Sequence, residues 1–263
     1  MSDRKERPII FSAPMIRAIL EGRKTVTRRV VKPQPEFRDV QGLFASWAFK
    51  GGLLYPNAKN DVLALCPYGQ PGDQLWLREA WRPAAWRDEG RVAVDYRASP
   101  EQNRTPWLDV PEGTWAEMWP RLTDEALAAL DAGRGSIRSE GDGFRWDRGD
   151  SPCRWRPSIH MPRWASRITL EVTSVRVERL QDISEDDAIA EGLHRIEIDS
   201  GYRDSYSATP STWAQVVEQE VAAYNDPTRA YRDLWESING AGSWDANPWV
   251  WVINFKRVEV ARG

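Results

Sequence analysis

Residues 165–193, ASRITLEVTSVRVERLQDISEDDAIAEGL, carry the clearest fold signal in the chain. The first half is rich in β-branched residues that recur with period two, which predicts a long β-strand. In the second half Ser184 and Asp187 stand three apart as in a capping box, and Gly192 predicts the end of a helix of about two turns. A long strand followed at once by a short helix is therefore expected here.

Similar signals lie towards both ends of the sequence. Ser12 is a candidate N-cap, and Gly22 a candidate terminator, for an amphipathic helix over residues 12–22. By the same criteria we expect further helices at residues 212–224 and 228–238, and strands at residues 8–11, 74–80 and 247–258. Strands separated by short helices favour an α+β unit built on a small β-barrel.

The middle of the chain differs in character. The segment LTDEALAALDAG, residues 122–133, predicts a short helix with Thr123 as N-cap, a Leu122/Leu127 staple and Gly133 as stop. Glycine-rich residues 131–152 and polar residues 199–211 are expected to be loops. We therefore expect one decorated domain over residues 1–263, with residues 82–155 inserted into it.

Composition restricts the class of protein. With 263 residues, 41% hydrophobic and 29% charged, the chain is long enough to bury a core. A net charge of −3 disfavours a broad nucleic-acid-binding face. Two cysteines without a C-x-x-C pattern argue against structural zinc, and no apolar run approaches the roughly 20 residues of a membrane span. We expect a cytoplasmic protein with no membrane partner.

Residues 19–33, ILEGRKTVTRRVVKP, place five cationic side chains against the single carboxylate of Glu21. One interpretation is an exit loop whose solvated cations complement the dipole of the preceding helix. The other is a site for an anionic or polar ligand. A lysine among arginines has its charged form disfavoured, so Lys24 is a candidate neutral base.

Further positions are open to two interpretations. Glu191, at the end of its short helix, is either solvated or faces Lys24. Trp76, Arg78, Glu79 and Trp81 follow a Pro-Gly-Asp turn and would wall a pocket, with tryptophan stacking a base and Glu79 reading an amino edge. In the alternative, Trp76 and Trp81 belong to the core. We expect His160 to be structural, and the thiols of Cys66 and Cys153 to be buried or incidental.

Several of these motifs together resemble a known family. GRKTVTRR after a short helix, PGDQLWLRE, the strand and helix of residues 167–193, and the closing WVWVINFKRV look like an ASCH domain of the PUA-like superfamily. The chain resembles the bacteriophage and prophage members of that family, in which SIHMPRWASRI and SWDANPWVWVI also occur. The resemblance covers residues 6–82 and 155–258, and it implies a PUA-like small barrel.

The resemblance also implies a site. In the small bacterial members that hydrolyse N4-acetylcytidine, the catalytic residues correspond to Lys24, Thr27 and Glu191. Arg23 and Arg29 would then bind substrate at the floor of a nucleoside pocket, together with the four residues of the Pro-Gly-Asp strand. The chain departs from the pattern at Arg28, where an apolar residue is common.

The expected function is thus hydrolysis of the N4-acyl amide of a modified cytidine or cytosine, without cofactor or metal. The alternatives are a non-catalytic module that binds RNA, single-stranded nucleic acid or a modified base, and a ribonuclease. If the gene is carried by a phage, the compartment is the host cytoplasm. The oligomeric state is not readable from the sequence.

Overall fold

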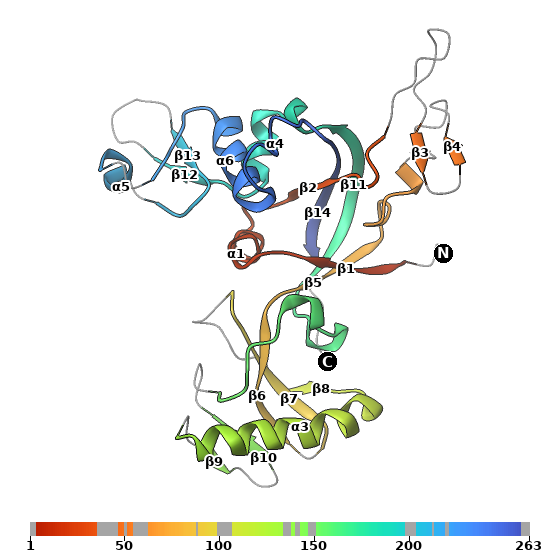
Figure 1. Cartoon of the computed structure of the whole chain (residues 1–263), viewed down its shortest axis with the longest axis vertical. Coiled ribbons are helices and arrows are strands. Elements are labelled where there is room, and N and C mark those ends of the chain that lie inside the picture. The colour runs from red at the N-terminus through yellow and green to blue at the C-terminus, as the bar shows by residue number, and fades with distance from the viewer. Residues whose placement is uncertain are drawn as a thin grey trace. The chain divides into compact units, whose positions relative to one another are not determined.

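The computed structural model describes residues 4–35, 47–49, 52–54, 63–87, 89–98, 107–133, 138–139, 143–146, 151–197, 204–211, 213–218 and 221–258. These residues divide into two compact units. One holds the described residues among Met1–Arg7, Ala18–Leu75 and Leu170–Val258, and the other those among Pro8–Arg17 and Trp76–Thr169. The predicted α+β class is confirmed, since helices combine with several sheets (Figure 1). The described residues of the stretch 82–155, expected as an insertion, all fall in the second unit.

Five strands form the larger sheet, in the order β1-β5-β11-β14-β2 (Figure 1). Their bounds are Glu6–Ile10 for β1, Gln74–Arg78 for β5, Thr169–Arg179 for β11, Trp249–Val258 for β14 and Val26–Val30 for β2. The long predicted strand is thus β11, and the predicted closing strand is β14. The two end strands of the order are β1 and β2.

Strand β2 corrects the interpretation of the basic stretch as an exit loop. The β-branched residues Val26, Thr27 and Val30 favour an extended chain, and β2 pairs antiparallel with β14. Arg28 is only 4% exposed, so it is not one of the solvated cations of a loop. The loop ends before Val26, and the arginines that follow belong to the sheet.

Several helices form around glycine and capping signals; the first, α1, has residues in both units, and the others belong to the first unit. α1 spans Ala13–Leu20, the 3-10 turn η4 spans Leu180–Asp182, α4 spans Glu185–Ala190, α5 spans Trp213–Val217 and α6 spans Pro227–Asn239. As predicted, the Ser184 side chain caps α4 by accepting a hydrogen bond from the Asp187 amide, and Gly192 has φ +100°. α4 and α6 lie side by side, and their apolar residues pack with Val26, Val250 and Val252 of the sheet (Figure 1).

Two sequence predictions in this unit are wrong. The helix expected over residues 212–224 is only α5, and Tyr224 instead forms a β-bridge with Tyr206. Val217, expected on the apolar face of that helix, is 62% exposed. Within residues 199–211, expected to be a loop, Ser205–Ser207 form strand β13, which pairs with β12, His194–Ile196.

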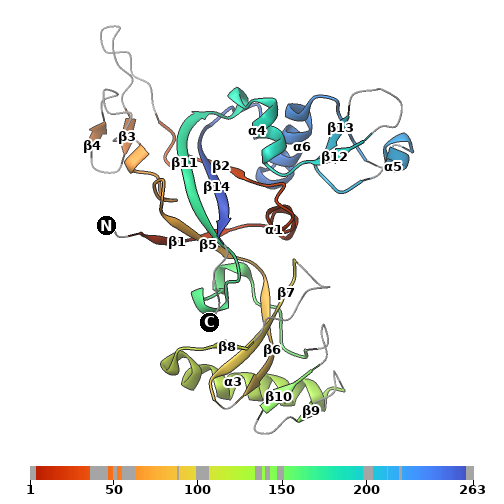
Figure 2. The same cartoon turned by 180° about the vertical axis from the view of Figure 1, so that it is seen from behind.

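The second unit has its own sheet, in the order β8-β7-β6-β10-β9. The bounds are Leu108–Asp109 for β8, Arg91–Tyr96 for β7, Trp81–Arg87 for β6, Gly143–Arg145 for β10 and Arg138–Ser139 for β9. Helix α3, Glu112–Asp131, runs across this sheet (Figure 2). Leu122 and Ala126 of the helix share a core with Trp86, Val92 and Val94 of the sheet.

Helix α3 corrects the prediction for residues 122–133. It begins ten residues earlier, so Thr123 is an interior residue and not the N-cap, although Gly133 follows the end as expected. Trp115, Met118 and Trp119 pack on the same core as Leu122, and this helical spacing extends the helix past Pro120. Leu127 is 46% exposed, so the proposed staple does not form.

Strands also occur in the predicted glycine-rich loop 131–152, since β9 and β10 pair there. Residues 134–137, 140–142 and 147–150 of that loop lie outside the described residues. The remaining elements are short: β3 Trp47–Phe49 pairs with β4 Gly52–Leu54, and the 3-10 turns η2 and η3 span Ser158–His160 and Arg163–Ala165.

Candidate functional site

A lysine and a glutamate meet in the first unit, where the turn after α1 passes the end of α4. Lys24 and Glu191 form an isolated β-bridge, and the Lys24 and Thr25 amides donate to the carbonyls of Ala18 and Ala190 at 3.0 and 2.9 Å. The Lys24 Nζ lies 2.5 Å from Glu191 Oε2 and 2.9 Å from the Glu191 carbonyl oxygen. The exposed fractions of the two side chains are 0% and 3%. Glu191 is therefore not solvated, and the interpretation in which it faces Lys24 is confirmed.

Gly192 allows the two chain segments to approach this closely. Its φ of +100° favours glycine, and a Cβ there would lie 2.9 Å from the Ala18 Cβ and 3.1 Å from the Lys24 Cβ. A larger residue would push Lys24 away from Glu191. The glycine that ends α4 thus also shapes the site.

Two further groups reach the other oxygen of the Glu191 carboxylate. Arg28 Nη1 lies 3.5 Å from Glu191 Oε1, and the Tyr231 hydroxyl of α6 donates to the same oxygen at 3.4 Å. The Arg28 guanidinium also lies 5.9 Å from the centroid of the Tyr231 ring. One carboxylate therefore has a cation at each oxygen.

Arg28 is anchored by a chain of ion pairs that leads towards the surface. Its Nη2 donates to Glu178 Oε1 at 2.6 Å and to Asp187 Oδ2 at 2.7 Å. Arg176, whose side chain is 38% exposed, donates to both of these carboxylates and to the Asn254 side chain. These contacts fix the guanidinium beside Glu191.

Burial is the largest influence on Lys24 and lowers its pKa below the usual value for lysine. The charge and hydrogen bond of Glu191 act in the opposite direction, whereas the charges of Arg29 and Arg28 lower the Lys24 pKa further. The amine is thus easier to deprotonate than an exposed lysine, as the sequence analysis expected from the neighbouring arginines.

The neighbours of Glu191 respond to the same carboxylate. Burial disfavours the charged form of Arg28 and acts to lower its pKa. The charge of Glu191 and the hydrogen bonds to Asp187 and Glu178 outweigh burial, so the Arg28 pKa is raised. Burial, followed by the charge of Glu191, raises the pKa of Tyr231 well above its ordinary value. At neutral pH the site therefore holds a fixed guanidinium and a neutral phenol.

Thr27, the third predicted catalytic residue, is 1% exposed and lies on β2 opposite Ile253 of β14. Neighbouring residues of a strand point to opposite faces. Thr27 therefore lies on the other face of β2 from Arg28, which is paired with Val252. The structure brings Lys24 and Glu191 into direct contact, and it places Thr27 in the strand that begins just after Lys24.

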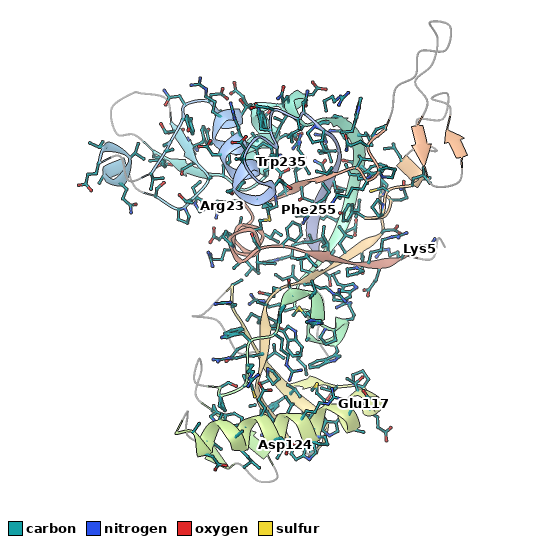
Figure 3. All side chains as sticks on the ribbon, viewed as in Figure 1. Lys5, Arg23, Glu117, Asp124, Trp235 and Phe255 are labelled. Atoms are coloured by element: carbon teal, nitrogen blue, oxygen red, sulfur yellow. The ribbon has the colours of Figure 1, made fainter. Side chains whose placement is uncertain are left out.

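The two arginines predicted to bind substrate belong to the same unit. Arg23 lies in the turn after α1 (Figure 3), donating to Glu21 at 2.5 and 2.8 Å and to the Gly192 carbonyl at 2.6 Å. Arg29 is partly buried on β2, where burial lowers its pKa and the Tyr68 hydroxyl opposes that effect. Arg23 thus supports the turn that carries Lys24.

The other four predicted substrate-binding residues belong to the second unit. Arg78 lies over the Trp76 ring at 4.8 Å, and Arg167 binds both carboxylate oxygens of Glu79 at 2.8 and 3.0 Å. Glu79 is 2% exposed, and burial raises its pKa despite that arginine. Trp81 is a core residue of the second unit, and Trp76 is 8% exposed. Burial of both tryptophans agrees with the alternative in which they belong to the core.

The remaining candidates are two buried thiols and one exposed histidine. Cys66 and Cys153 are free and buried, and burial raises their pKa values to about 11 and about 12. His160 is exposed on η2 and lines a surface hollow of about 640 Å³ within the second unit. The other lining residues of that hollow are Asp124, Glu125, Ala128, Pro152, Arg154, Trp155, Arg156 and Pro157.

Sequence reasoning missed Arg28, Tyr231 and Asp187 as members of the site. Tyr231 appeared only as an apolar position of a helix, and Arg28 only as a departure from a pattern. The one usable signal was the period-two alternation of β2, which puts Arg28 on the face of the buried residues Val26 and Val252.

Among the described residues, no group of three or more His, Cys, Asp and Glu side chains is placed to hold a metal ion. In the same part of the chain, no helix combines the length and the apolar character needed to cross a membrane. Comparisons with protein-family models, curated proteins and solved structures found no match to this chain.

Proposed function

We propose that this protein hydrolyses the N4-acyl amide of a modified cytidine or cytosine where Lys24 meets Glu191, with Thr27 of the adjoining strand β2 as the third residue. The observation that carries the proposal is the buried contact of 2.5 Å between Lys24 Nζ and Glu191 Oε2. Amide hydrolysis needs a base for the nucleophile and an acid for the leaving amine, and a linked lysine and carboxylate can supply both. Closure of the larger sheet into a PUA-like barrel belongs to the same proposal.

The chemistry balances without a cofactor. The neutral Lys24 amine takes a proton from water, or from the Thr27 hydroxyl, and the resulting oxygen nucleophile attacks the acyl carbonyl carbon. As the bond from that carbon to N4 breaks, the proton passes from Lys24 through Glu191 to N4. The products are the free carboxylic acid and the unmodified cytosine amine. If Thr27 is the nucleophile, water then releases the acyl group from it.

The environment of the pair supports this chemistry. A lowered Lys24 pKa increases the neutral fraction at working pH, and a site shielded from water strengthens the electrostatic interactions within it. Because the two side chains are 0% and 3% exposed, substrate binding has to displace residues that cover them. So enclosed a site favours a single nucleoside or flipped base over a long polymer, and the net charge of −3 agrees with a small ligand.

The test measures turnover and affinity together for the purified protein with N4-acetylcytidine, followed by chromatography of the products. We expect the parent to release cytidine. Lys24→Arg should reduce the rate by at least about 100-fold, because a guanidinium cannot accept the proton. Lys256→Arg, at a lysine whose side chain is 62% exposed, is the matched control and should leave the rate unchanged.

The outcome also separates the alternatives. Binding without turnover of any N4-acylated cytosine or cytidine by the parent would identify a reader of modified bases. Cleavage of RNA that is lost in Lys24→Arg would identify a ribonuclease. Amide hydrolysis that persists undiminished in a folded Lys24→Arg protein would contradict the proposed mechanism.

A further inference from the structure

Two cations share one buried carboxylate at this site. Lys24 Nζ and Arg28 Nη1 both reach Glu191, and the side chains of Lys24, Arg28 and Glu191 are 0%, 0% and 3% exposed. A buried charge is unfavourable unless an opposite charge compensates it, and Glu191 compensates Lys24 less fully when Arg28 binds the same carboxylate. The arrangement therefore works against the charged form of Lys24.

Arg28 is the second of these two cations. Its Nη1 lies 3.5 Å from Glu191 Oε1, on the other side of the carboxylate from Lys24 Nζ at Oε2. Its Nη2 is fixed by Glu178 and Asp187 at 2.6 and 2.7 Å. With an apolar residue in place of Arg28, Lys24 would no longer share the Glu191 carboxylate with this guanidinium, and the charged form of Lys24 would be favoured.

We propose that Arg28 is a positioning residue: it holds and neutralises the Glu191 carboxylate from the side opposite Lys24, and so frees Lys24 to give up its proton. Arg28 itself does not need to touch the substrate. The inference rests on the proposed function only in giving Lys24 a use as a base. The charge arrangement that it describes can be measured without any substrate.

The other groups that face Lys24 and Glu191 do not replace Arg28. Tyr231 of α6 donates a neutral hydroxyl to Glu191 Oε1 at 3.4 Å, and its own pKa is raised. Arg29 of β2 adds a second positive charge that lowers the Lys24 pKa, and by the alternation of the strand it lies on the other face of β2 from Arg28. Asp187 of α4 and Glu178 of β11 contact Arg28 and hold it in place.

The experiment is an NMR titration of lysine labelled with ¹³C at Cε. The chain has six lysines, so few signals arise, and Lys24→Arg assigns the signal of Lys24 by its loss. In Arg28→Met we expect the pKa of Lys24 to rise by about one unit, the smaller end of the shift caused by a neighbouring charge. Arg28→Lys keeps the charge and should shift it by less than about half a unit.

A second variant guards against loss of folding in Arg28→Met. Asp187→Asn removes a carboxylate that offsets the charge of Arg28, so the pKa of Lys24 should move down. Opposite shifts in the two variants cannot arise from general damage to the structure. A Lys24 pKa that stays the same or falls in Arg28→Met, or that stays the same or rises in Asp187→Asn, would overturn the inference.

The activity profile supplies the second readout. If the parent hydrolyses N4-acetylcytidine, the acid limb of its rate should move to higher pH in Arg28→Met by the same shift as the titration, and return in Arg28→Lys. If the parent shows no turnover, the proposed function fails while the titration still decides the role of Arg28. The two failures are therefore distinguishable.

Discussion

Replacing Glu191 by glutamine should destabilise the protein strongly at neutral pH. The Lys24 side chain is 0% exposed, and in Glu191→Gln it would remain near Arg28 and Arg29 without its carboxylate. Removing one partner of a buried ion pair typically lowers the free energy of unfolding by about 3–5 kcal/mol. We expect a loss in that range at pH 7.

Replacing Lys24 instead of Glu191 should lower the free energy of unfolding by a smaller amount. In Lys24→Met the Glu191 carboxylate keeps Arg28 Nη1 at 3.5 Å and the Tyr231 hydroxyl at 3.4 Å. The expected loss is therefore about 1–3 kcal/mol, as for a buried polar group that loses one of several partners. The predicted order, with Glu191→Gln less stable than Lys24→Met, follows from the asymmetry of the cluster.

The loss in Glu191→Gln should depend on pH. Burial already lowers the Lys24 pKa, and Glu191 raises it, so removing Glu191 lowers it further. Between that lowered pKa and the unfolded value of about 10.4, the unfolded chain binds one more proton than the folded chain. Stability of the variant should therefore begin to rise at a lower pH than that of the parent, by up to about 1.4 kcal/mol per unit, so its deficit against the parent should be smaller at pH 9.5 than at pH 7.

The assay is urea unfolding followed by tryptophan fluorescence at both pH values. Lys256 and Glu171 form the matched control, because their ion pair of 2.8 Å has a Lys256 side chain 62% exposed. Lys256→Met should change the free energy of unfolding by less than about 1 kcal/mol. A Glu191→Gln loss no larger than this, or one that does not change with pH, would refute the reasoning.

Three other substitutions or probes test the site and its surroundings. Thr27→Ala should reduce kcat for N4-acetylcytidine by at least about 100-fold and change the Kd little, which kinetics and calorimetry together would check. Gly192→Ala should lower the Tm, because its Cβ would lie 2.9 Å from that of Ala18 at φ +100°, and an unchanged Tm would contradict this. The thiols of Cys66 and Cys153, with pKa values raised to about 11 and about 12, should react with a disulfide reagent at pH 8 only after unfolding.

The sequence predicted elements whose signals are local. β11 follows from period-two β-branched residues, and α4 follows from the Ser184 cap and the Gly192 stop, all within about thirty residues. These signals act through neighbouring backbone groups, so tertiary packing does not need to be known. The predictions of α6 and β14 succeeded for the same reason.

Errors arose where distant contacts decide the structure. Helix α3 extends past Pro120 because Trp115, Met118 and Trp119 pack on a core of the second unit. β2 is a strand because it pairs with β14, more than two hundred residues later in the chain. No local pattern around either segment records these partners.

The residues of the candidate site likewise include some that the sequence predicted and some that only distant contacts reveal. The charge pattern of residues 19–33 marked Lys24 as unusual, and a family resemblance linked it to Glu191, which lies 167 residues away. Neither source predicted Tyr231, because its helical spacing is that of an ordinary core residue. The burial of Arg28 was hidden for a related reason: its carboxylate partners Glu178 and Asp187 lie 150 and 159 residues away.

A buried lysine–glutamate pair is a poor choice for stability alone. Apolar residues of similar volume are often as stabilising or more so, since charges lose their hydration on burial. Here the pair also lies beside Arg28, which binds the same carboxylate and works against the charged form of Lys24. An arrangement that retains an amine in a buried site and favours loss of its proton is more readily explained by proton transfer than by folding. The bias of the site towards the neutral Lys24 amine, and not the ion pair itself, makes the Lys24 titration the measurement that bears most directly on function.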